Sequence, residues 1–180
     1  MATYYSNVWN TIIRPTHAGG GGVVEVPGSL KVPNGTALAT ADVLKLFRVG
    51  SGGHVRNVWV ENSDFATTAG PGTFGHYGVD DGVAIDADSI IADVALETAT
   101  SRNFENFASD LTSAGANFQA PFATLTEDAS FEIVVGTMNG GISNTDRYIR
   151  FVVEVVFFGA DRNPFAYDWN GEASGLSNRE

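Results

Sequence analysis

Hydrophobic and polar residues alternate most clearly near the end of the chain, in residues 147–158. One face of this segment carries Ile149, Phe151, Val153, Val155 and Phe157, and the other carries Tyr148, Arg150, Val152, Glu154, Val156 and Phe158. Because successive side chains of a strand point to opposite faces, the pattern predicts a long strand with one buried face. Burying each inward side chain contributes roughly 1.5–3 kcal/mol, so this strand is expected to be central in its sheet.

Shorter apolar runs bounded by turn residues predict further strands. These runs cover residues 23–26, 29–32, 43–49, 54–61, 73–79 and 131–138. Pro27-Gly28 is expected to end the first run, and Asn34-Gly35 and Asn139-Gly140-Gly141 are typical of tight turns. The runs on either side of the glycine loop at residues 50–53 are expected to form a hairpin or a sheet corner.

One segment has a spacing closer to that of a helix. Ile90, Ile91, Val94 and Ala95 recur at helical intervals and Asp88 can cap the start, so residues 88–96 predict a short helix. Residues 103–115 are interpreted as a loop or a second short helix. Many strands with Gly and Pro turns, and no repeated strand–helix–strand order, predict a mainly β fold. The expected architecture is an antiparallel β-sandwich, jelly-roll-like, with one or two short helices.

The chain is expected to divide into a body and two extensions. Residues 1–22 predict an extended N-terminal arm ending in a hinge of four glycines, residues 23–159 the sandwich body, and residues 160–180 a C-terminal extension. Aromatic side chains in both extensions are candidates for binding a partner protein: Tyr4, Tyr5, Trp9, Phe165, Tyr167 and Trp169. Two interpretations of the N-terminal arm stay open, because its aromatics can cover the core of their own chain or dock on a neighbouring subunit.

Charge and composition narrow the range of partners. The 180 residues include 10 Lys and Arg against 21 Asp and Glu, for a net charge of −11. Such an acidic chain is not expected to bind nucleic acid or an anionic membrane. The sequence has no cysteine, which excludes disulfides and thiolate metal sites. The most apolar stretch, residues 151–158, is too short for a transmembrane helix, and the first thirty residues lack a signal-peptide pattern.

Residues that carry out chemistry show no recognisable arrangement. The three histidines do not have the spacing of zinc ligands, and no serine lies in a nucleophile elbow. Asp80-Asp81-Gly82 and Asp86-Ala87-Asp88 look like fragments of calcium loops, yet both lack the full ligand pattern. We therefore predict no enzyme activity, no catalytic residues, no cofactor and no metal site. Whether the acidic residues 80–88 bind an ion is left open.

Most of the body, residues 30–158, resembles a set of small structural proteins of tailed bacteriophages. The similar segments are residues 30–49, LKVPNGTALATADVLKLFRV; residues 54–60, HVRNVWV; residues 77–82, YGVDDG; and the late strand pair at 128–135 and 148–154. The resemblance implies a head decoration (cement) protein with a jelly-roll-like fold, often a trimer. Such a protein is made in the host cytoplasm, is located on the outer surface of the virion capsid, binds the major capsid protein and bridges neighbouring capsid subunits.

Two other functions are compatible with the residues. The first is a head–tail or tail-fibre component, which is also structural. The second is a carbohydrate-binding sandwich, in which Trp59 and Tyr77 lie beside the acidic block and stack against a sugar.

Overall fold

The computed structural model describes residues 1–15, 22–65, 67–69, 72–79, 81–94, 96, 99–105, 125–136, 138–140 and 145–157. All regular elements in this part of the chain are strands: β1 (Thr3–Tyr5), β2 (Ile12–Ile13), β3 (Gly22–Val32), β4 (Val43–Val49), β5 (Gly53–Asn62), β6 (Thr67–Ala69), β7 (Gly72–Gly78), β8 (Ala84–Val94), β9 (Thr100–Glu105), β10 (Ala129–Val134), β11 (Met138–Gly140) and β12 (Arg147–Phe157). The predicted mainly β fold is confirmed.

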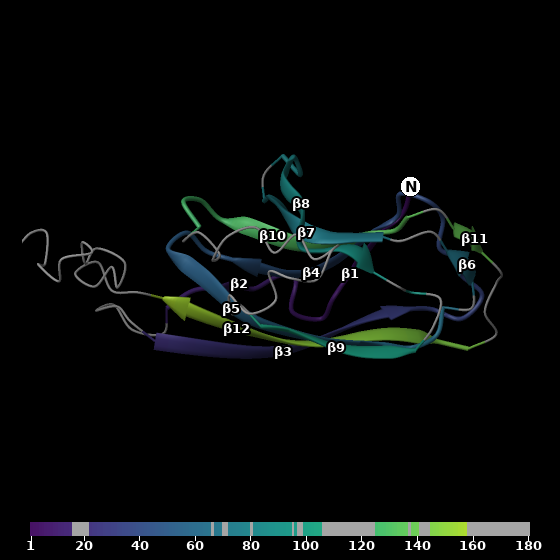
Figure 1. The fold of residues 1–180 in the computed structure, drawn as a ribbon, viewed down its shortest axis with the longest axis horizontal. Coiled ribbons are helices and arrows are strands. Elements are labelled where there is room, and N and C mark those ends of the chain that lie inside the picture. Colours follow the sequence, from purple (N-terminus) through teal and green to yellow (C-terminus); the bar gives the residue numbers. More distant parts are fainter. Residues whose placement is uncertain are drawn as a thin grey trace, which may run out of the picture.

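Two sheets face each other and enclose the core (Figure 1). One sheet has the strand order β1-β4-β10-β7-β8, with β2 also paired to β4, and the other has the order β3-β12-β5-β9. A small ribbon of β6 and β11 lies at one end of the molecule (Figure 1). Apart from the parallel pairing of β1 and β2 with β4, the strands are antiparallel, so the predicted antiparallel sandwich is confirmed.

Strands that are distant in the sequence pair in a nested order. Strand β3 pairs with β12, β4 with β10, β5 with β9, and β7 with β8. The chain therefore follows the path of one long hairpin that has been rolled up, and β3, β4, β5 and β7 alternate between the two sheets. Strands β4 and β5 lie in different sheets, so the glycine loop between them makes the sheet corner rather than a hairpin.

The predicted inner face of the last strand forms the middle of the core. Its alternate apolar residues, Ile149, Phe151, Val153, Val155 and Phe157, are all buried, as expected. Strand β12 lies between β3 and β5, which confirms its central position. Across the core, the ring of Phe47 stacks on Phe131 at 4.7 Å between ring centroids and contacts Phe151 of the opposite sheet at 5.6 Å. Aromatic packing therefore joins the two layers.

The predicted helix at residues 88–96 is wrong, because residues 84–94 form β8. This strand pairs with β7 through three shifts of register, and extra residues in a bulged strand break the strict alternation of side chains. The broken alternation leaves apolar residues at intervals that resemble a helix. The described residues contain no helix. Residues 103–105 of the second candidate belong to β9 rather than to a loop or helix, and residues 106–115 lie outside the described residues.

Three other predicted boundaries are also wrong. Residues 23–26 and 29–32 belong to the single strand β3, because Pro27 lies on an edge strand, where its missing N–H costs no ladder hydrogen bond. Gly28 follows it, and a Cβ atom there would overlap the ring of Phe151. The strand predicted at residues 131–138 ends at Val134, and Asn139 and Gly140 lie in β11 rather than in a turn.

Candidate interaction surface

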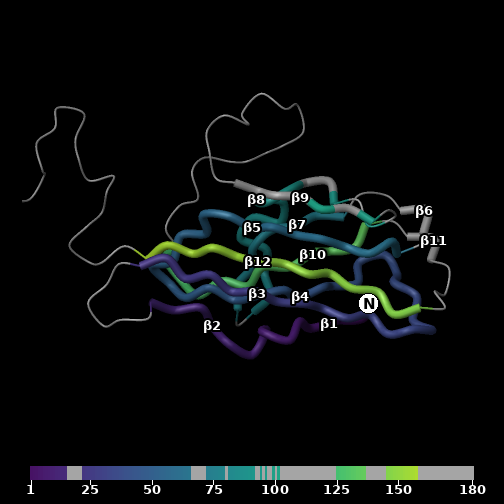
Figure 2. Tube along the Cα trace, turned by 90° about the horizontal axis from the view of Figure 1, so that it is seen from below, coloured from purple at the N-terminus to yellow at the C-terminus, as the bar shows by residue number. Residues whose placement is uncertain are grey.

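The first fifteen residues lie along the edge of one sheet of their own chain. Strand β1 runs parallel to β4, and β2 pairs with the end of the same strand. Between them, the buried Ser6 donates its hydroxyl to the carbonyl of Leu46, and Ile13 joins the core. Asn7 connects this segment to the other sheet, because its N–H donates to the carbonyl of Ser29 at 2.9 Å. The N-terminal segment thus closes the flank of the sandwich beside β3 and β4, where Figure 2 shows it.

The three N-terminal aromatics of the predicted partner-binding set have different environments. Tyr4 is half-buried and packs against the core, where burial and the nearby Asp42 raise its pKa above the ordinary value. Tyr5 is 56% exposed, and its ring lies 5.9 Å from that of Trp9, centroid to centroid. Tyr4 therefore helps to hold the segment in place, while Tyr5 and Trp9 form an aromatic surface. Phe165, Tyr167 and Trp169 lie outside the described residues.

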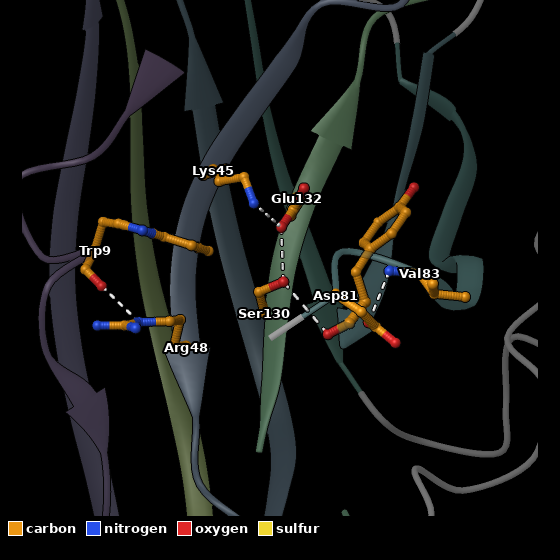
Figure 3. Close-up of polar contacts among 8 residues, drawn as sticks. Trp9, Lys45, Arg48, Asp81, Val83, Ser130 and Glu132 are labelled. Carbon is orange, nitrogen blue, oxygen red and sulfur yellow. Dashed lines mark hydrogen bonds and ion pairs between the residues drawn. The ribbon is translucent and has the colours of Figure 1, made fainter. Parts of the chain in front are cut away.

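Two cations lie against the indole ring of Trp9. Lys45 Nζ is 4.9 Å from the ring centroid and Arg48 Cζ is 5.3 Å from it, within the range of cation–π attraction. Arg48 Nε also donates to the backbone carbonyl of Trp9 at 2.8 Å (Figure 3). We call the group of Tyr5, Trp9, Lys45 and Arg48 the N-terminal patch. Its positive charge is notable on a chain with a net charge of −11.

A polar network behind the patch fixes Lys45. Its ammonium group lies 2.9 Å from the carboxylate of Glu132, which is only 4% exposed on β10. The hydroxyl of Ser130 donates to the same carboxylate at 2.6 Å and also lies 3.3 Å from the carbonyl oxygen of Tyr77 (Figure 3). Charged hydrogen bonds of this kind hold both partners in one geometry. Lys45 is thereby neutralised, whereas Arg48 has no carboxylate partner among the side chains that the structure describes.

Most other described cations are already paired with carboxylates. Ion pairs join Arg14 to Asp128, Lys31 to Asp146, Arg56 to Glu154 and Arg150 to Glu61. Arg48 and Arg147 are the two basic side chains, among those that the structure describes, without such a pair. Of these two, Arg48 is partly exposed and Arg147 is buried.

The buried Arg147 is a residue that the sequence interpretation missed. It is 1% exposed and donates to the backbone carbonyls of Phe65, at 3.0 Å, and of Thr36. Its guanidinium also lies 5.2 Å from the centroid of the Phe65 ring, and desolvation lowers its pKa. The available signal was its parity, because Arg147 falls on the same face of β12 as Ile149. This side chain joins two loops to the core.

Residues 81–88 of the acidic segment form a turn and the start of β8, and Asp80 lies outside the described residues. The carboxylate of Asp81 accepts the N–H of Val83 at 2.9 Å and so closes the turn (Figure 3). Desolvation and the neighbouring Asp88 raise the pKa of Asp86. Across the strand pair, His76 Nδ1 lies 2.8 Å from the hydroxyl of Ser89. No group of three or more metal-ligating side chains is found in the ranges that the structure describes.

The two aromatics of the proposed sugar site do not come together. Trp59 lies on β5 in one sheet, whereas Tyr77 is on β7 in the other sheet and is buried. Burial raises the pKa of the Tyr77 hydroxyl, which fits a structural side chain. Among the described residues, no helix has the length and apolar character needed to cross a membrane.

Comparisons with known proteins give a likeness of fold. No protein-family model and no curated protein sequence matches the chain. A chain in the solved structure "Capsid of Ralstonia phage GP4" superposes with a TM-score of 0.59 and 14% identity, covering 88% of this chain and 100% of that one. A chain in "Cyanophage Pam1 capsid asymmetric unit" has a TM-score of 0.43 and 18% identity, over 82% of this chain and 93% of that one. The sandwich described above is thus shared with a chain from a phage capsid over that chain's whole length.

Proposed function

We propose that this protein is a structural component of a bacteriophage capsid, and in particular a head decoration protein. In this role it binds the major capsid protein on the outer surface of the shell and bridges neighbouring capsid subunits. The fold likeness to a chain of the Ralstonia phage GP4 capsid supports the capsid origin, since it extends over all of that chain. The similarity of residues 30–158 to phage structural proteins is independent support.

The strand connectivity supports the jelly-roll form of the sandwich. The two main sheets contain eight strands, counted in chain order as β3, β4, β5, β7, β8, β9, β10 and β12. In this count, the sheet β3-β12-β5-β9 has the order first, eighth, third and sixth, and the other sheet contains the remaining four strands. A long hairpin rolled into two packed sheets has this order, and viral capsid domains are a common place for it. The resemblance also implies a trimer on the particle, which stays a prediction.

The single observation that carries the attachment role is the N-terminal patch. Aromatic side chains and arginine contribute most of the binding energy at protein interfaces, and here they occur together on a fixed surface. Tyr5 is more than half exposed although it is large and apolar, and Arg48 has no ion pair with a carboxylate among the described side chains. The patch therefore offers an aromatic anchor and a cation to an acidic or carbonyl-rich site on a capsid subunit.

Side-chain variants test this role better than deletion of residues 1–18. Deletion would also remove Ser6 and Ile13, which are buried in the body, so it would expose the core. We expect the double variant Tyr5→Ala with Trp9→Ala to fold, and to occupy purified capsids that lack the protein at a much lower copy number. Ile85→Ala is the matched control, because Ile85 is an exposed apolar side chain on β8, away from the patch.

Copy number is measured by co-sedimentation with the capsids and by reconstruction of the decorated particle. Normal occupancy by the double variant would contradict attachment through the patch. Density for the protein only at the portal vertex or on a fibre would instead favour the head–tail or tail-fibre alternative.

A further inference from the structure

The outer face of the sheet β3-β12-β5-β9 carries an apolar row across three strands. Val152 is the register partner of both Pro27 on β3 and Trp59 on β5, so these residues lie side by side. Pro27 is exposed, and Val152 and Trp59 are half-buried although they point away from the core. Figure 2 looks onto this face, with β12 running across its middle. A tryptophan with an apolar row at the centre of a sheet is typical of a protein-binding surface.

Charged residues flank the row with a particular symmetry. On one side, Arg150 of β12 lies 3.8 Å from Glu61 of β5. On the other side, the order is reversed, since Glu154 of β12 lies 3.2 Å from Arg56 of β5. Each pair is neutral, and Glu25 of β3, the register partner of Glu154, adds one exposed carboxylate to the same face. Because four of these charges are paired within the chain, two copies meet less repulsion here than the net charge of −11 alone would impose.

We propose that this face binds the same face of a second copy of the chain, about a two-fold axis that runs along the apolar row. Such an axis lies across the strands and inverts the position along each strand. It places the row on itself and sets Arg150 against Glu154 of the second copy. On β5, the same axis brings Glu61 of one copy close to Arg56 of the second copy, because the two residues lie on opposite sides of Trp59. The surface is thus complementary to itself in charge as well as in apolar character.

The same axis also matches the ends of the face. Tyr148, four residues before Val152, comes to lie over Val156 of the second copy, four residues after it. On β3, Val23 comes to lie beside the aliphatic stem of Lys31. Tyr148 and Val23 are 36% and 55% exposed in the single chain, so the contact would remove apolar surface from water at both ends.

The area available fits a weak, reversible dimer. Strands about 4.8 Å apart with a rise of about 3.3 Å per residue give a four-stranded face of roughly 600 Å² per copy. The total of roughly 1,200 Å² is at the lower end of specific interfaces. We therefore expect dissociation in the micromolar range.

The two-fold axis has a consequence for attachment, which rests on the proposed function. The row begins at Pro27 on β3, which is the edge strand of its sheet. The N-terminal segment lies beside this strand, since the N–H of Asn7 donates to the carbonyl of Ser29. Rotation about the row keeps this flank on the same side. Both N-terminal segments therefore lie on the same flank of the dimer, and each patch, on the outer face of the sheet that is not in the contact, can bind its own capsid subunit.

The test uses single charge reversals and their mixture. In the Arg150→Glu variant, like charges face each other twice across the two-fold axis, and the same holds for Glu154→Arg. In a mixed pair, one copy has Glu at both positions and the other has Arg at both, so all contacts become complementary. We expect each variant alone to associate roughly a hundredfold more weakly than the parent chain, and the equimolar mixture to recover dimers.

Sedimentation velocity over a series of concentrations measures the association. Circular dichroism and thermal melting check that each variant is folded, and Arg14→Glu, at the other sheet, is the control that leaves dimerisation unchanged. Trp59→Ser provides a variant without a charge change and should weaken dimers at least tenfold. The proposal is overturned if the parent chain stays monomeric at a few hundred micromolar. It is also overturned if both charge-reversal variants associate as well as the parent chain, or if their equimolar mixture does not form dimers. Each of these results leaves the attachment test with the N-terminal patch unaffected.

Discussion

Val153→Asp would place a carboxyl group at the centre of the core. Val153 is 0% exposed on β12, and its register partners are Val26 of β3 and Val58 of β5. Losing its apolar burial costs about 1.5–3 kcal/mol, and a carboxylate in the same place costs several kcal/mol more. The sum is about 5 kcal/mol or more, against a total stability of about 5–15 kcal/mol for a typical domain. The variant is expected to unfold at a urea concentration about 2 M or more below that of the parent chain, or not to fold.

Urea unfolding followed by tryptophan fluorescence and circular dichroism measures this loss. Val152→Asp is the matched control, since Val152 is one residue away on the outer face of the same strand. Dilute protein keeps the control independent of dimerisation. A buried carboxyl has a raised pKa and is tolerated better when protonated, so the damage by Val153→Asp should be smaller at pH 5 than at pH 7. If Val153→Asp unfolds within about 0.5 M of the parent, or no earlier than the control, the central position of β12 is misjudged.

Three further substitutions test polar contacts. Glu132→Gln removes the charge that pairs with Lys45, and we expect thermal melting to show that the free energy of unfolding falls by about 1.5–3 kcal/mol. The double variant Lys45→Met with Glu132→Leu should recover much of this stability. If it recovers none, the pairing is refuted. Burial lowers the pKa of His76 below its ordinary value of 6.5, so the unfolded chain takes up a proton first and stability falls as the pH drops below about 6.5. In His76→Gln the difference between the urea midpoints at pH 7.5 and pH 5.5 should be smaller than in the parent, and an equal difference would count against this assignment. Arg147→Met should lower the melting temperature by leaving the carbonyls of Thr36 and Phe65 without a donor, and an unchanged melting temperature would show that water replaces the guanidinium.

The alternation in residues 147–157 was sufficient to predict the central strand and its buried face. Local pattern worked here because β12 is regular on its inner face, so the period of two is kept from Arg147 to Phe157. The same pattern also contained the buried guanidinium. Arg147 has the inward parity, but an arginine is read as a surface residue unless the carbonyls that accept its hydrogen bonds are known, and these come from residues 36 and 65.

Strand β8 shows why the helix prediction failed. Its register against β7 shifts three times, and at Gly75 a Cβ atom would overlap the backbone of residues 86 and 87. The bulged path of β8 thus depends on a glycine eleven residues earlier, which a local window of hydrophobic spacing does not include. A similar bulge at Arg56 turns both Val55 and Val58 inward, whereas strict alternation would place them on opposite faces.

The N-terminal patch could be predicted only in part. The sequence identified Tyr5 and Trp9 as candidate anchors, because large aromatics near a glycine run are unusual in an unstructured segment. Their cationic neighbours, Lys45 and Arg48, lie about forty residues later and arrive through the parallel pairing of β1 and β2 with β4. Pairing over this distance is set by packing of the whole sandwich, so no motif in the sequence signals it.

The two surfaces together make a prediction about bridging that neither makes alone. Two weak sites held on one rigid body bind a surface more tightly than either site does, because the second contact forms at a high effective concentration. Arg150→Glu leaves Tyr5 and Trp9 intact but removes the dimer, so it should lower shell occupancy at limiting protein concentration and have little effect at saturation. The variant without Tyr5 and Trp9 should still dimerise, yet fail to decorate the shell. If Arg150→Glu decorates shells as well as the parent chain at every concentration, each copy attaches independently, and bridging must then depend on contacts within a single chain.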